Sequence, residues 1–539
     1  MSKYILSVFY AVIILFADES FSQVPNFRIH PSTSNQIEPA IVKHPTNPLI
    51  MFASSFTIRL SFKSEGVYVT TDGGVSWFGS DTCTGTPISN HGGDPGPIID
   101  KDGRLILTHQ GGFVLGMYSN YSTDLGQTWS SNYQIAGNDQ DKGSPATDAI
   151  PTSPYYGRTY LVWTRFTNPF PIALSYTTNG GVNWSGVIQL NNSQPSHQSL
   201  GPVMVVGPGG KCYASWASSI LTSPFNEDCI GFGVSTNGGL NWNNNECAYD
   251  CNGIKSSSLQ PWGIRVNGYP AMDIDKTGGS RNGWIYIVTA EKNLLPAGSD
   301  PDIVFHRSTD EGQTWSAGVR VNQDAFNNGK IQILPAINVD DQGGINVVYF
   351  DNRNISLDSS QVYLSRSTDG GVIWRDYLIS DHNFKPKGIA GAGSGNQGDN
   401  IGVTSVGKKL WPVWMDDNTG VYQIWAAPVD LNTIGVNQIS DLVPDGYSLS
   451  QNYPNPFNPT TNLEFGISEL GFVSLKVYDL LGKEVKTLVY ENLNAGRYKV
   501  EFDGSGLSSG IYFYKLEVSL SNPLEAGSFV QTKRMLLVK

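Results

Sequence analysis

Short runs of alternating apolar and polar residues recur along the first 430 residues, and this period of two predicts β-strands. Seven runs form one series, from EPAIV and PGPIID to LPAINV and GDNIGV, and each precedes a second apolar run such as LIMFASS or KLWPVWMDD. Third runs such as GVYVTT lead into an octet that is repeated along the chain. Short fourth runs such as GVRVNQ follow the octet. Four-stranded units repeated around a ring form a β-propeller. We therefore predict an all-β propeller over residues 23–430 with seven blades, six being the alternative, and residues 26–32 complete the last blade.

The octet reads TTDGGVSW at residues 70–77 and recurs five more times, at intervals of 52 to 73 residues. Its residues suit a hairpin turn, because the Asp accepts hydrogen bonds from turn amides, the Gly takes a positive φ and the Trp packs back on the sheet. Two copies carry Asn, which a turn tolerates and a catalytic acid does not. We interpret the octets as structural. Their characteristic positions are Asp72, Trp77, Asp124, Trp129, Asn179, Trp184, Asn237, Trp242, Asp310, Trp315, Asp369 and Trp374.

The octets match the Asp-box, or BNR repeat, Ser/Thr-x-Asp-x-Gly-x-Thr-Trp, and the propeller resembles the sialidase-like superfamily over residues 26–430. The resemblance implies a β-propeller fold. Its members include sialidases, other glycoside hydrolases, receptor ectodomains and proteins of unknown activity. The repeat therefore identifies a hairpin and leaves the activity open.

The composition changes after Asp430, where residues 431–446 are predicted as a linker. Alternating runs with glycine turns over residues 447–539 then predict a small Ig-like antiparallel sandwich. The strings NYPNPFNPTT, VYDLLGKEV and SGIYFYKL resemble the C-terminal sorting domain of the type IX secretion system. The resemblance implies Sec export, contact of the tail with the type IX machinery, and release or attachment at the cell surface. An ordinary Ig-like accessory domain is the alternative.

The N-terminus predicts a signal peptide over residues 1–22. Lys3 precedes an apolar run at residues 4–16, and small residues at 20 and 22 favour cleavage before Gln23. This run is too short to span a bilayer and no later segment approaches the needed length, so we expect no membrane span after cleavage. A net charge of −12 disfavours binding to nucleic acid.

The five cysteines, Cys83, Cys212, Cys229, Cys247 and Cys251, contain no CxxC pair, so we expect no zinc site and no other cofactor. The acidic loops also lack a 12-residue calcium pattern. The odd number leaves at least one thiol free. We expect a local disulfide to involve Cys247 and Cys251.

Loops that leave the second strands, and loops between blades, lie on the face opposite the octet turns, where propeller ligands usually bind. We predict candidate ligand residues there at Arg165, Glu291, Asp351, Arg353, Asp416, Asp417, Asp399 and Glu38. The same ends and loops also hold Arg59, His109, Asp94 and Asp141. The alternative for Asp351 and Arg353 is an ion pair that braces their own blade, and Arg165 with Glu291 would suit an ordinary ion pair.

Sialidases, as the resemblance implies, use three arginines, a Tyr nucleophile with a Glu base, and an Asp acid. The string FRIH at residues 27–30 resembles the motif of the first arginine, but it lies one strand too early. The position in register holds Glu38, which would repel a sialic acid carboxylate. We therefore expect no sialidase activity and predict a secreted or surface propeller that binds extracellular glycan or protein. The alternative is a glycoside hydrolase of sialidase-like type, or a lyase, with an acidic pair on this face.

Overall fold

The computed structural model describes residues 25–59, 62–83, 91–112, 116–431, 437–440, 443–469, 471–493, 495–504, 507–520 and 528–539. The predicted signal peptide lies outside these residues. The chain divides into two compact units, which meet between Val429 and Asp430. In the described part of the chain, β-strands dominate and one 3-10 turn occurs, η1 (Pro208–Gly210). No helix there has the length and apolar character needed to cross a membrane.

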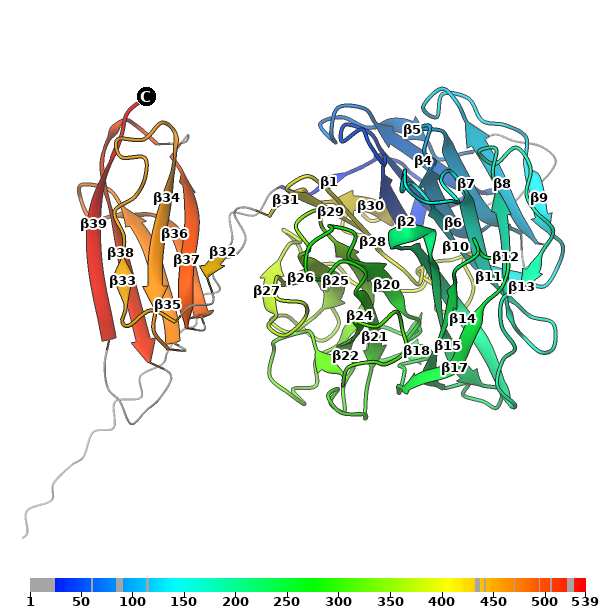
Figure 1. Ribbon diagram of the computed structural model, residues 1–539. Helices are drawn as coiled ribbons and strands as arrows, with labels where there is room; N and C mark the ends of the chain where they lie inside the picture. Colours follow the sequence, from blue (N-terminus) through cyan, green and yellow to red (C-terminus); the bar gives the residue numbers. More distant parts are fainter. Residues whose placement is uncertain are drawn as a thin grey trace, which may run out of the picture. The chain divides into compact units, whose positions relative to one another are not determined.

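The first unit contains seven antiparallel sheets built mainly from four strands each, together with a two-stranded sheet of β18 (Ser256–Leu259) and β19 (Ile264–Val266) (Figure 1). Blade 1 contains β2 (Asn35–Lys43), β3 (Met51–Arg59), β4 (Phe62–Thr70) and β5 (Phe78–Ser80). Blade 2 contains β6 (His91–Ile99), β7 (Leu105–Gly111), β8 (Met117–Ser122) and β9 (Tyr133–Ala136). Blade 3 contains β10 (Gln140–Thr147), β11 (Thr159–Arg165), β12 (Ile172–Thr177) and β13 (Ile188–Gln189). Blade 4 contains β14 (His197–Val206), β15 (Cys212–Ile220), β16 (Glu227–Ser235) and β17 (Asn243–Asp250).

The remaining blades follow the same plan. Blade 5 contains β20 (Ala271–Ile274), β21 (Ile285–Glu291), β22 (Asp302–Ser308) and β23 (Val319–Arg320). Blade 6 contains β24 (Gln332–Val339), β25 (Ile345–Asp351), β26 (Gln361–Ser367) and β27 (Arg375–Leu378). Blade 7 contains β28 (Gly402–Val406), β29 (Lys409–Asp416) and β30 (Gln423–Ala426), with β31 (Val429–Asp430) paired to β29. The first strands β2, β6, β10, β14, β20, β24 and β28 contact one another in turn around the ring.

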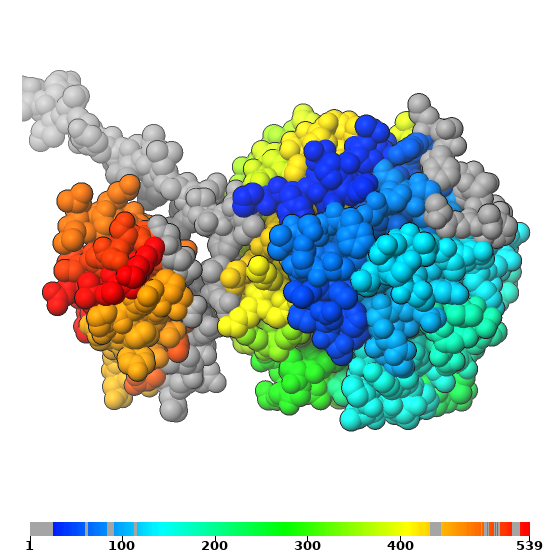
Figure 2. All heavy atoms as spheres, turned by 90° about the horizontal axis from the view of Figure 1, so that it is seen from above, coloured from blue at the N-terminus to red at the C-terminus, as the bar shows by residue number. Residues whose placement is uncertain are grey.

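The N-terminal strand β1 (Phe27–Arg28) closes the ring. It pairs with β30, with Phe27 opposite Ala426 and Arg28 opposite Trp425. In Figure 2 the blue N-terminal residues accordingly lie beside yellow residues from the end of the propeller. The prediction of seven blades closed by residues 26–32 is thereby confirmed. Arg28 belongs to the outer strand of blade 7, as the register of the FRIH string indicated.

Five of the first strands contain a β-bulge, which is the feature that positions the candidate site. The register shifts in β2, β6, β10, β14 and β24. Each shift contains one residue with a φ between 53° and 56°: Glu38, Asp94, Lys142, Gly201 and Leu334. Pro or Gly follows each of them in the sequence. A bulge bends its strand and turns a side chain out of the regular alternation, so these positions can face the axis of the ring.

Each octet forms a closed hairpin turn. In the copy at residues 308–315, Ser308 Oγ donates to Asp310 Oδ1 (2.7 Å), and Thr314 donates through N–H to Oδ1 (2.9 Å) and through Oγ1 to Oδ2 (2.5 Å). Asn179 and Asn237 keep both bonds to Oδ1. The residue four positions later is Asn in both copies, so no hydroxyl needs the second oxygen. Asn therefore suffices at these two turns.

The octets also join each blade to the preceding one. Trp315 of blade 5 lies edge-on against Phe232 of blade 4, with ring centroids 5.1 Å apart, and Trp374 of blade 6 contacts Phe305 of blade 5 in the same way. A Cβ atom at Gly312 would lie 2.0 Å from Phe232. We predicted that the Trp packs back on its own sheet, whereas it packs between two sheets.

The disulfide joins Cys229 to Cys247, with their Cα atoms 5.4 Å apart. This differs from the pairing expected from the sequence. The register between β16 and β17 shifts after Ile230, which brings Cys247 beside Cys229. Cys251 instead lies buried in the apolar core shared by blades 4 and 5, as a free thiol. Cys83 and Cys212 are also free and buried.

The second unit contains two four-stranded antiparallel sheets. One has the order β32 (Asn437–Ser440), β37 (Gly496–Asp503), β34 (Thr460–Ile467) and β33 (Ser448–Leu449). The other has the order β36 (Glu484–Leu493), β35 (Gly471–Tyr478), β38 (Gly510–Leu520) and β39 (Ser528–Leu537). β32 thus pairs within this unit although it lies in the range predicted as a linker.

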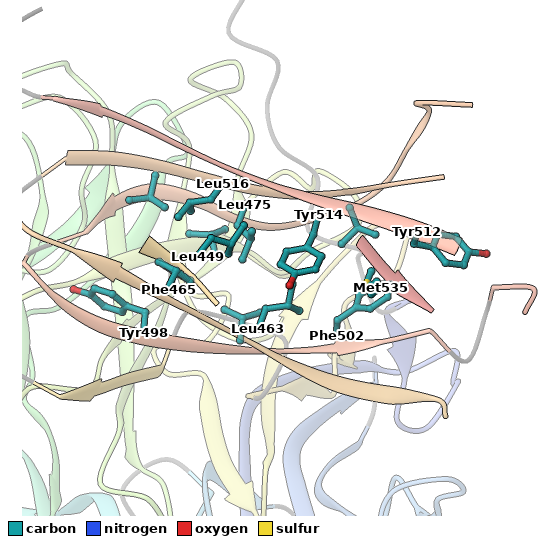
Figure 3. Packing of buried hydrophobic residues seen from close by; sticks show 14 of the residues in the cluster. Leu449, Leu463, Phe465, Leu475, Tyr498, Phe502, Tyr512, Tyr514, Leu516 and Met535 are labelled. Atoms are coloured by element: carbon teal, nitrogen blue, oxygen red, sulfur yellow. The ribbon is translucent and has the colours of Figure 1, made fainter. Parts of the chain in front are cut away.

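Apolar side chains from both sheets form one core in this unit. Figure 3 shows Leu463 and Phe465 of β34 packed with Leu475 of β35 and Leu516 of β38. At its edge the Tyr514 hydroxyl accepts a hydrogen bond from the N–H of Asn452 (2.8 Å) and donates one to the carbonyl of Ser450 (2.8 Å). These bonds tie the start of the NYPNPFNP segment to the sheet.

Candidate functional site

The propeller contains a cavity of about 1040 Å³ on the face opposite the octet turns. Its wall comes from the starts of β6, β10 and β14, the ends of β3 and β7, and the hairpin of β18 (Ser256–Leu259) and β19 (Ile264–Val266). Because the strands of a blade alternate in direction, these ends share one face. The β18–β19 hairpin is inserted between blades 4 and 5, which accounts for the longest interval between octets.

Two bulge residues and one residue of the loop before β28 bring three carboxyl groups together in this cavity. One oxygen from each of Glu38, Asp94 and Asp399 lies within 4.8 Å of the other two. Glu38 Oε2 accepts a hydrogen bond from the N–H of Asp94 (2.9 Å). The ammonium group of Lys142 forms an ion pair with Asp94 Oδ1 (3.4 Å) and another with Asp399. Arg265 Nη2 lies 3.7 Å from Asp399 Oδ2. The cluster therefore mixes close carboxyl groups with two cations.

These carboxyl groups have different proton affinities. Burial, followed by the charges of Asp94 and Asp399, raises the pKa of Glu38 to about 8. Burial and the same two charges also raise the pKa of Asp141 to about 8. Burial acts in the same direction on Asp399, but Lys142 and Arg265 outweigh it and lower the pKa of that carboxyl. At neutral pH the cavity thus holds neutral and ionised carboxyl groups side by side.

Basic and aromatic side chains complete the wall. Among its described residues five side chains are basic and four acidic: Arg59, Lys63, Lys142, Lys255, Arg265, and Glu38, Asp94, Asp141, Asp399. The side chains of Arg59 and Arg265 are 55% and 49% exposed, so both can meet a ligand. Phe166 and Phe225 also line the cavity and are exposed. An exposed ring offers a flat apolar surface for the CH groups of a ligand.

The structure separates the predicted ligand residues into two groups. Glu38 and Asp399 line the cavity, together with Arg59, Asp94 and Asp141 from the same predicted face. The following residues lie outside its wall: Arg165, Glu291, Asp351, Arg353, Asp416 and Asp417.

Arg353 braces its own blade. Its side chain is only 9% exposed and forms ion pairs with Asp351 (2.6 Å) and Asp376. It also donates to the hydroxyl of Tyr349 (2.9 Å) and lies over the ring of Tyr363, 4.3 Å from the centroid. All three guanidinium nitrogens therefore have partners inside blade 6, in agreement with the ion-pair alternative.

Asp416 and Asp417 are engaged in a similar way. Asp416 is fully buried, accepts a hydrogen bond from Trp414 Nε1 (2.7 Å) and pairs with His382 Nε2 (3.0 Å). Asp417 forms an ion pair with Lys387. Both carboxylates have their partners in the region of blade 7.

Arg165 and Glu291 do not pair with each other. Arg165 Nε donates to Thr167 Oγ1 (3.1 Å). Glu291 is 1% exposed and accepts a hydrogen bond from Thr289 Oγ1 (2.5 Å), and burial raises its pKa to about 7. Neither residue contacts the carboxyl cluster.

The sequence reasoning missed Lys142 and Arg265, the two cations of the cluster. The sequence does contain a signal for Lys142. Lys142 occupies the same place in its first strand as Glu38 and Asp94 do in theirs, with a glycine after it instead of a proline. Arg265 lies in the inserted hairpin, which has no counterpart in the other blades and therefore no repeat to align with.

Residues 451–522 match the family described as the secretion system C-terminal sorting domain. The chain carries a sorting tail. This tail indicates export by the type IX secretion system to the cell surface or beyond it. The prediction made from the NYPNPFNPTT, VYDLLGKEV and SGIYFYKL strings is confirmed.

Solved structures match the chain at low sequence identity and with TM-scores below 0.5. A protein of unknown function from Dyadobacter fermentans is 11% identical, with 76% of this chain and 98% of that chain covered and a TM-score of 0.43. A polysaccharide lyase described as an ulvan lyase is 11% identical, with 74% and 94% covered and a TM-score of 0.48. A Hadza microbial sialidase is 13% identical, with 72% and 75% covered and a TM-score of 0.41. No curated protein matches the chain in sequence.

Proposed function

We propose that the exported propeller binds an anionic extracellular glycan in the cavity opposite the octets. The charge of the cavity wall is the observation that carries this proposal. Five basic side chains face four acidic ones, and two of the acidic groups, Glu38 and Asp141, have a pKa of about 8. Both are mostly protonated at neutral pH, so the wall is positive there although the whole chain is acidic.

The exposed guanidinium groups suit the acidic groups of a polysaccharide. Arg59 and Arg265 are about half-exposed, so a uronate or sulfate group can reach them, and a guanidinium group is more weakly hydrated than an ammonium group. Arginine can hold such a group through two parallel hydrogen bonds. Burial lowers the pKa of Lys255, so its proton is held less firmly than usual, and the two arginines therefore carry most of the attraction.

The size and aromatic lining of the cavity also favour a carbohydrate. Ligand sites usually measure about 300–1,000 Å³, and the cavity of about 1040 Å³ lies at the upper end. It has room for several sugar rings. Phe166 and Phe225 provide exposed rings on which the CH faces of these sugars can stack.

A sialidase site fits this wall poorly. Among its described residues, Arg59 and Arg265 are the arginines, one fewer than the three implied by the superfamily. Burial raises the pKa of Tyr269 well above its usual range, which opposes its use as a nucleophile. Glu38 occupies the position at which a sialidase would carry the first of its three arginines.

Binding to purified polysaccharides tests the proposal. A uronate polymer and a sulfated polymer should bind, a neutral polymer should not, and added salt should weaken binding. Arg265→Gln should weaken binding about 10- to 100-fold, as expected when a charge-assisted hydrogen bond is lost. Lys409→Gln removes the same charge from the exposed first residue of β29 on the octet face and serves as the matched control. Equal binding of neutral and anionic polymers, or equal effects of both substitutions, would contradict the proposal.

Cleavage of the bound glycan is a second candidate function. The observation that favours it is the difference in pKa between Glu38 and Asp399. Glu38, with a pKa of about 8, can donate a proton at neutral pH, whereas Asp399, with a lowered pKa, stays ionised. Incubation with each glycan that binds, followed by detection of new reducing or unsaturated ends, tests it. Glu38→Gln should abolish product while binding persists. No new ends from any bound glycan would leave binding as the function.

A further inference from the structure

A second polar cluster lies beside the cavity, between blades 1 and 2. Glu65 of β4, His91 of β6 and His109 of β7 are 0%, 4% and 0% exposed. One potential ligand atom from each residue lies within 4.8 Å of the other two. His91 also forms part of the cavity wall. Apart from this wall position of His91, none of the three residues has a role in the glycan site proposed above.

Glu65 and His91 have unsatisfied polar atoms. Among the described residues, His91 Nδ1 has no hydrogen-bond partner, and the Glu65 carboxyl has only the backbone N–H of Gly93 near it, with no bond of normal geometry to either oxygen. Glu65 Oε1 and His91 Nδ1 lie 3.9 Å apart, too far for a hydrogen bond. Buried polar groups are almost always hydrogen-bonded, and a buried carboxylate without a partner is strongly unfavourable. These atoms are therefore arranged for a group that supplies positive charge.

The hydrogen bonds of His109 point to the same conclusion. Asn120 Nδ2 donates to the carbonyl of Ser130 (2.9 Å), which turns Asn120 Oδ1 toward His109 Nε2 (3.0 Å). Nε2 must then carry the hydrogen, and Nδ1 of the neutral ring is an acceptor. Nδ1 lies 3.1 Å from the carbonyl oxygen of Gln110, another acceptor. Two acceptors at this distance need a proton or a cation near them.

We propose that Glu65, His91 and His109 bind a divalent transition-metal ion of the zinc type. Two imidazoles and one carboxylate are a common set of three protein ligands for zinc, with the fourth position open. A ligating histidine usually donates its other ring N–H to a nearby acceptor, and the bond from His109 Nε2–H to Asn120 Oδ1 would provide this support. Because His91 also lines the cavity, water from the cavity can occupy the fourth position.

Metal binding requires a small closure of the site. Bonds of about 2 Å bring the ligand atoms of a tetrahedral ion to about 3.3 Å from one another, compared with up to 4.8 Å here. The rings of His91 and His109 are stacked, with centroids 4.0 Å apart and planes inclined by 12°. One ring must tilt so that both nitrogens point at the ion. The carboxyl cluster of Glu38, Asp94 and Asp399 is a weaker metal candidate, because Lys142 already supplies its cation.

The test measures metal binding by the full chain. After removal of metal with a chelator, the protein should take up one equivalent of Zn²⁺, and Co²⁺ in its place should give the visible absorption of a four- or five-coordinate nitrogen and oxygen site. Glu65→Gln and His91→Gln should each weaken Zn²⁺ binding by more than about 100-fold, since even supporting residues contribute about 10- to 100-fold. Asn120→Ala should weaken it within that smaller range.

Matched controls separate ligand loss from general damage. Glu227→Gln alters another fully buried glutamate with an unpartnered oxygen, and His306→Gln alters another buried histidine. Glu38→Gln alters the neighbouring carboxyl cluster. All three should keep the Zn²⁺ affinity of the natural protein. The thermal midpoint of the natural protein should also rise with Zn²⁺ and fall with chelator, which tests the site even if a ligand variant fails to fold.

Three results would overturn the proposal. The natural protein could bind neither Zn²⁺ nor Co²⁺ and show the same thermal midpoint with and without them, in which case Glu65 holds a proton instead. Glu65→Gln and His91→Gln could bind Zn²⁺ as tightly as the controls do. Loss of Zn²⁺ from Glu38→Gln alone would assign the ion to the other cluster.

Discussion

Glu38 should make the propeller less stable as the pH rises, and Glu38→Gln should remove this effect. The pKa of Glu38 is about 8 in the folded chain, against 4.5 for an ordinary glutamate. Between these values the folded chain keeps a proton that the unfolded chain has released. Raising the pH through this window therefore favours unfolding. The contribution of Glu38 is most favourable below pH 4.5 and is lost as the pH approaches 8.

The size of the effect follows from the width of this window. Each pH unit within it changes the free energy of unfolding by about 1.4 kcal/mol. Between pH 5 and pH 7.5 the loss should be about 2–3 kcal/mol, allowing for the charges that Glu38 shares with Asp94 and Asp399. Glutamine has nearly the same shape and does not titrate. Glu38→Gln should thus be more stable than the natural protein by about 2–3 kcal/mol at pH 7.5 and nearly equal to it at pH 5.

Urea unfolding followed by tryptophan fluorescence provides the measurement. All 13 tryptophans precede residue 430, so the signal reports the propeller alone. Glu311→Gln, an exposed carboxyl paired with Lys211, is the control and should change stability by less than about 0.5 kcal/mol at either pH. A Glu38→Gln variant that is less stable at both pH values, or equally shifted at both, would refute the reasoning. The stability of Glu38→Gln should still fall somewhat as the pH rises, because the pKa of Asp141 is also raised to about 8.

Two further substitutions test the inter-blade packing and the brace in blade 6. Gly312 and Gly420 have φ values of 86° and 84°, but only at Gly312 would a Cβ atom meet the preceding blade. Gly420→Ala should therefore cost about 1–2 kcal/mol for the backbone conformation, and Gly312→Ala should cost about 1–3 kcal/mol more in urea unfolding. Equal losses would mean that the octet glycine makes no tight contact. Arg353→Ala should cost about 3–5 kcal/mol because two carboxylates lose their cation, while glycan binding stays unchanged. Weaker glycan binding with unchanged stability would instead indicate that Arg353 contacts the ligand.

The blade count was predictable because each strand and turn repeats with a local chemical signature. The strand alternation and the octets marked the blades. Because blade 7 lacked a fourth strand of its own, the N-terminal segment was expected to complete the ring. These signals depend on neighbours in sequence. The pairing of Cys229 with Cys247 was not predictable in this way. It depends on a register shift between β16 and β17, and the residue types in these strands do not indicate that shift.

The candidate site was predictable only in part. Of the predicted residues, Glu38 and Asp399 line the cavity, because first strands and the loops before them lie innermost in the ring. Asp351, Arg353 and Asp416 end second strands, which lie one position further from the axis, and their charges are neutralised within their own blades. Charge at a strand end is thus a weak guide to a ligand site unless the strand is the innermost one.

The pairing of β1 with β30 links residues almost 400 positions apart and has a consequence for how the protein matures. β1 is the first of these strands to be synthesised, whereas β30 is among the last. Until the two meet, β30 presents unpaired N–H and C=O groups at the edge of a sheet, and such an edge recruits strands from other chains. Two residues, Phe27 and Arg28, form the ladder that covers this edge. Proteolytic trimming beyond Arg28 would therefore leave the last blade as an open site for strand exchange between neighbouring molecules.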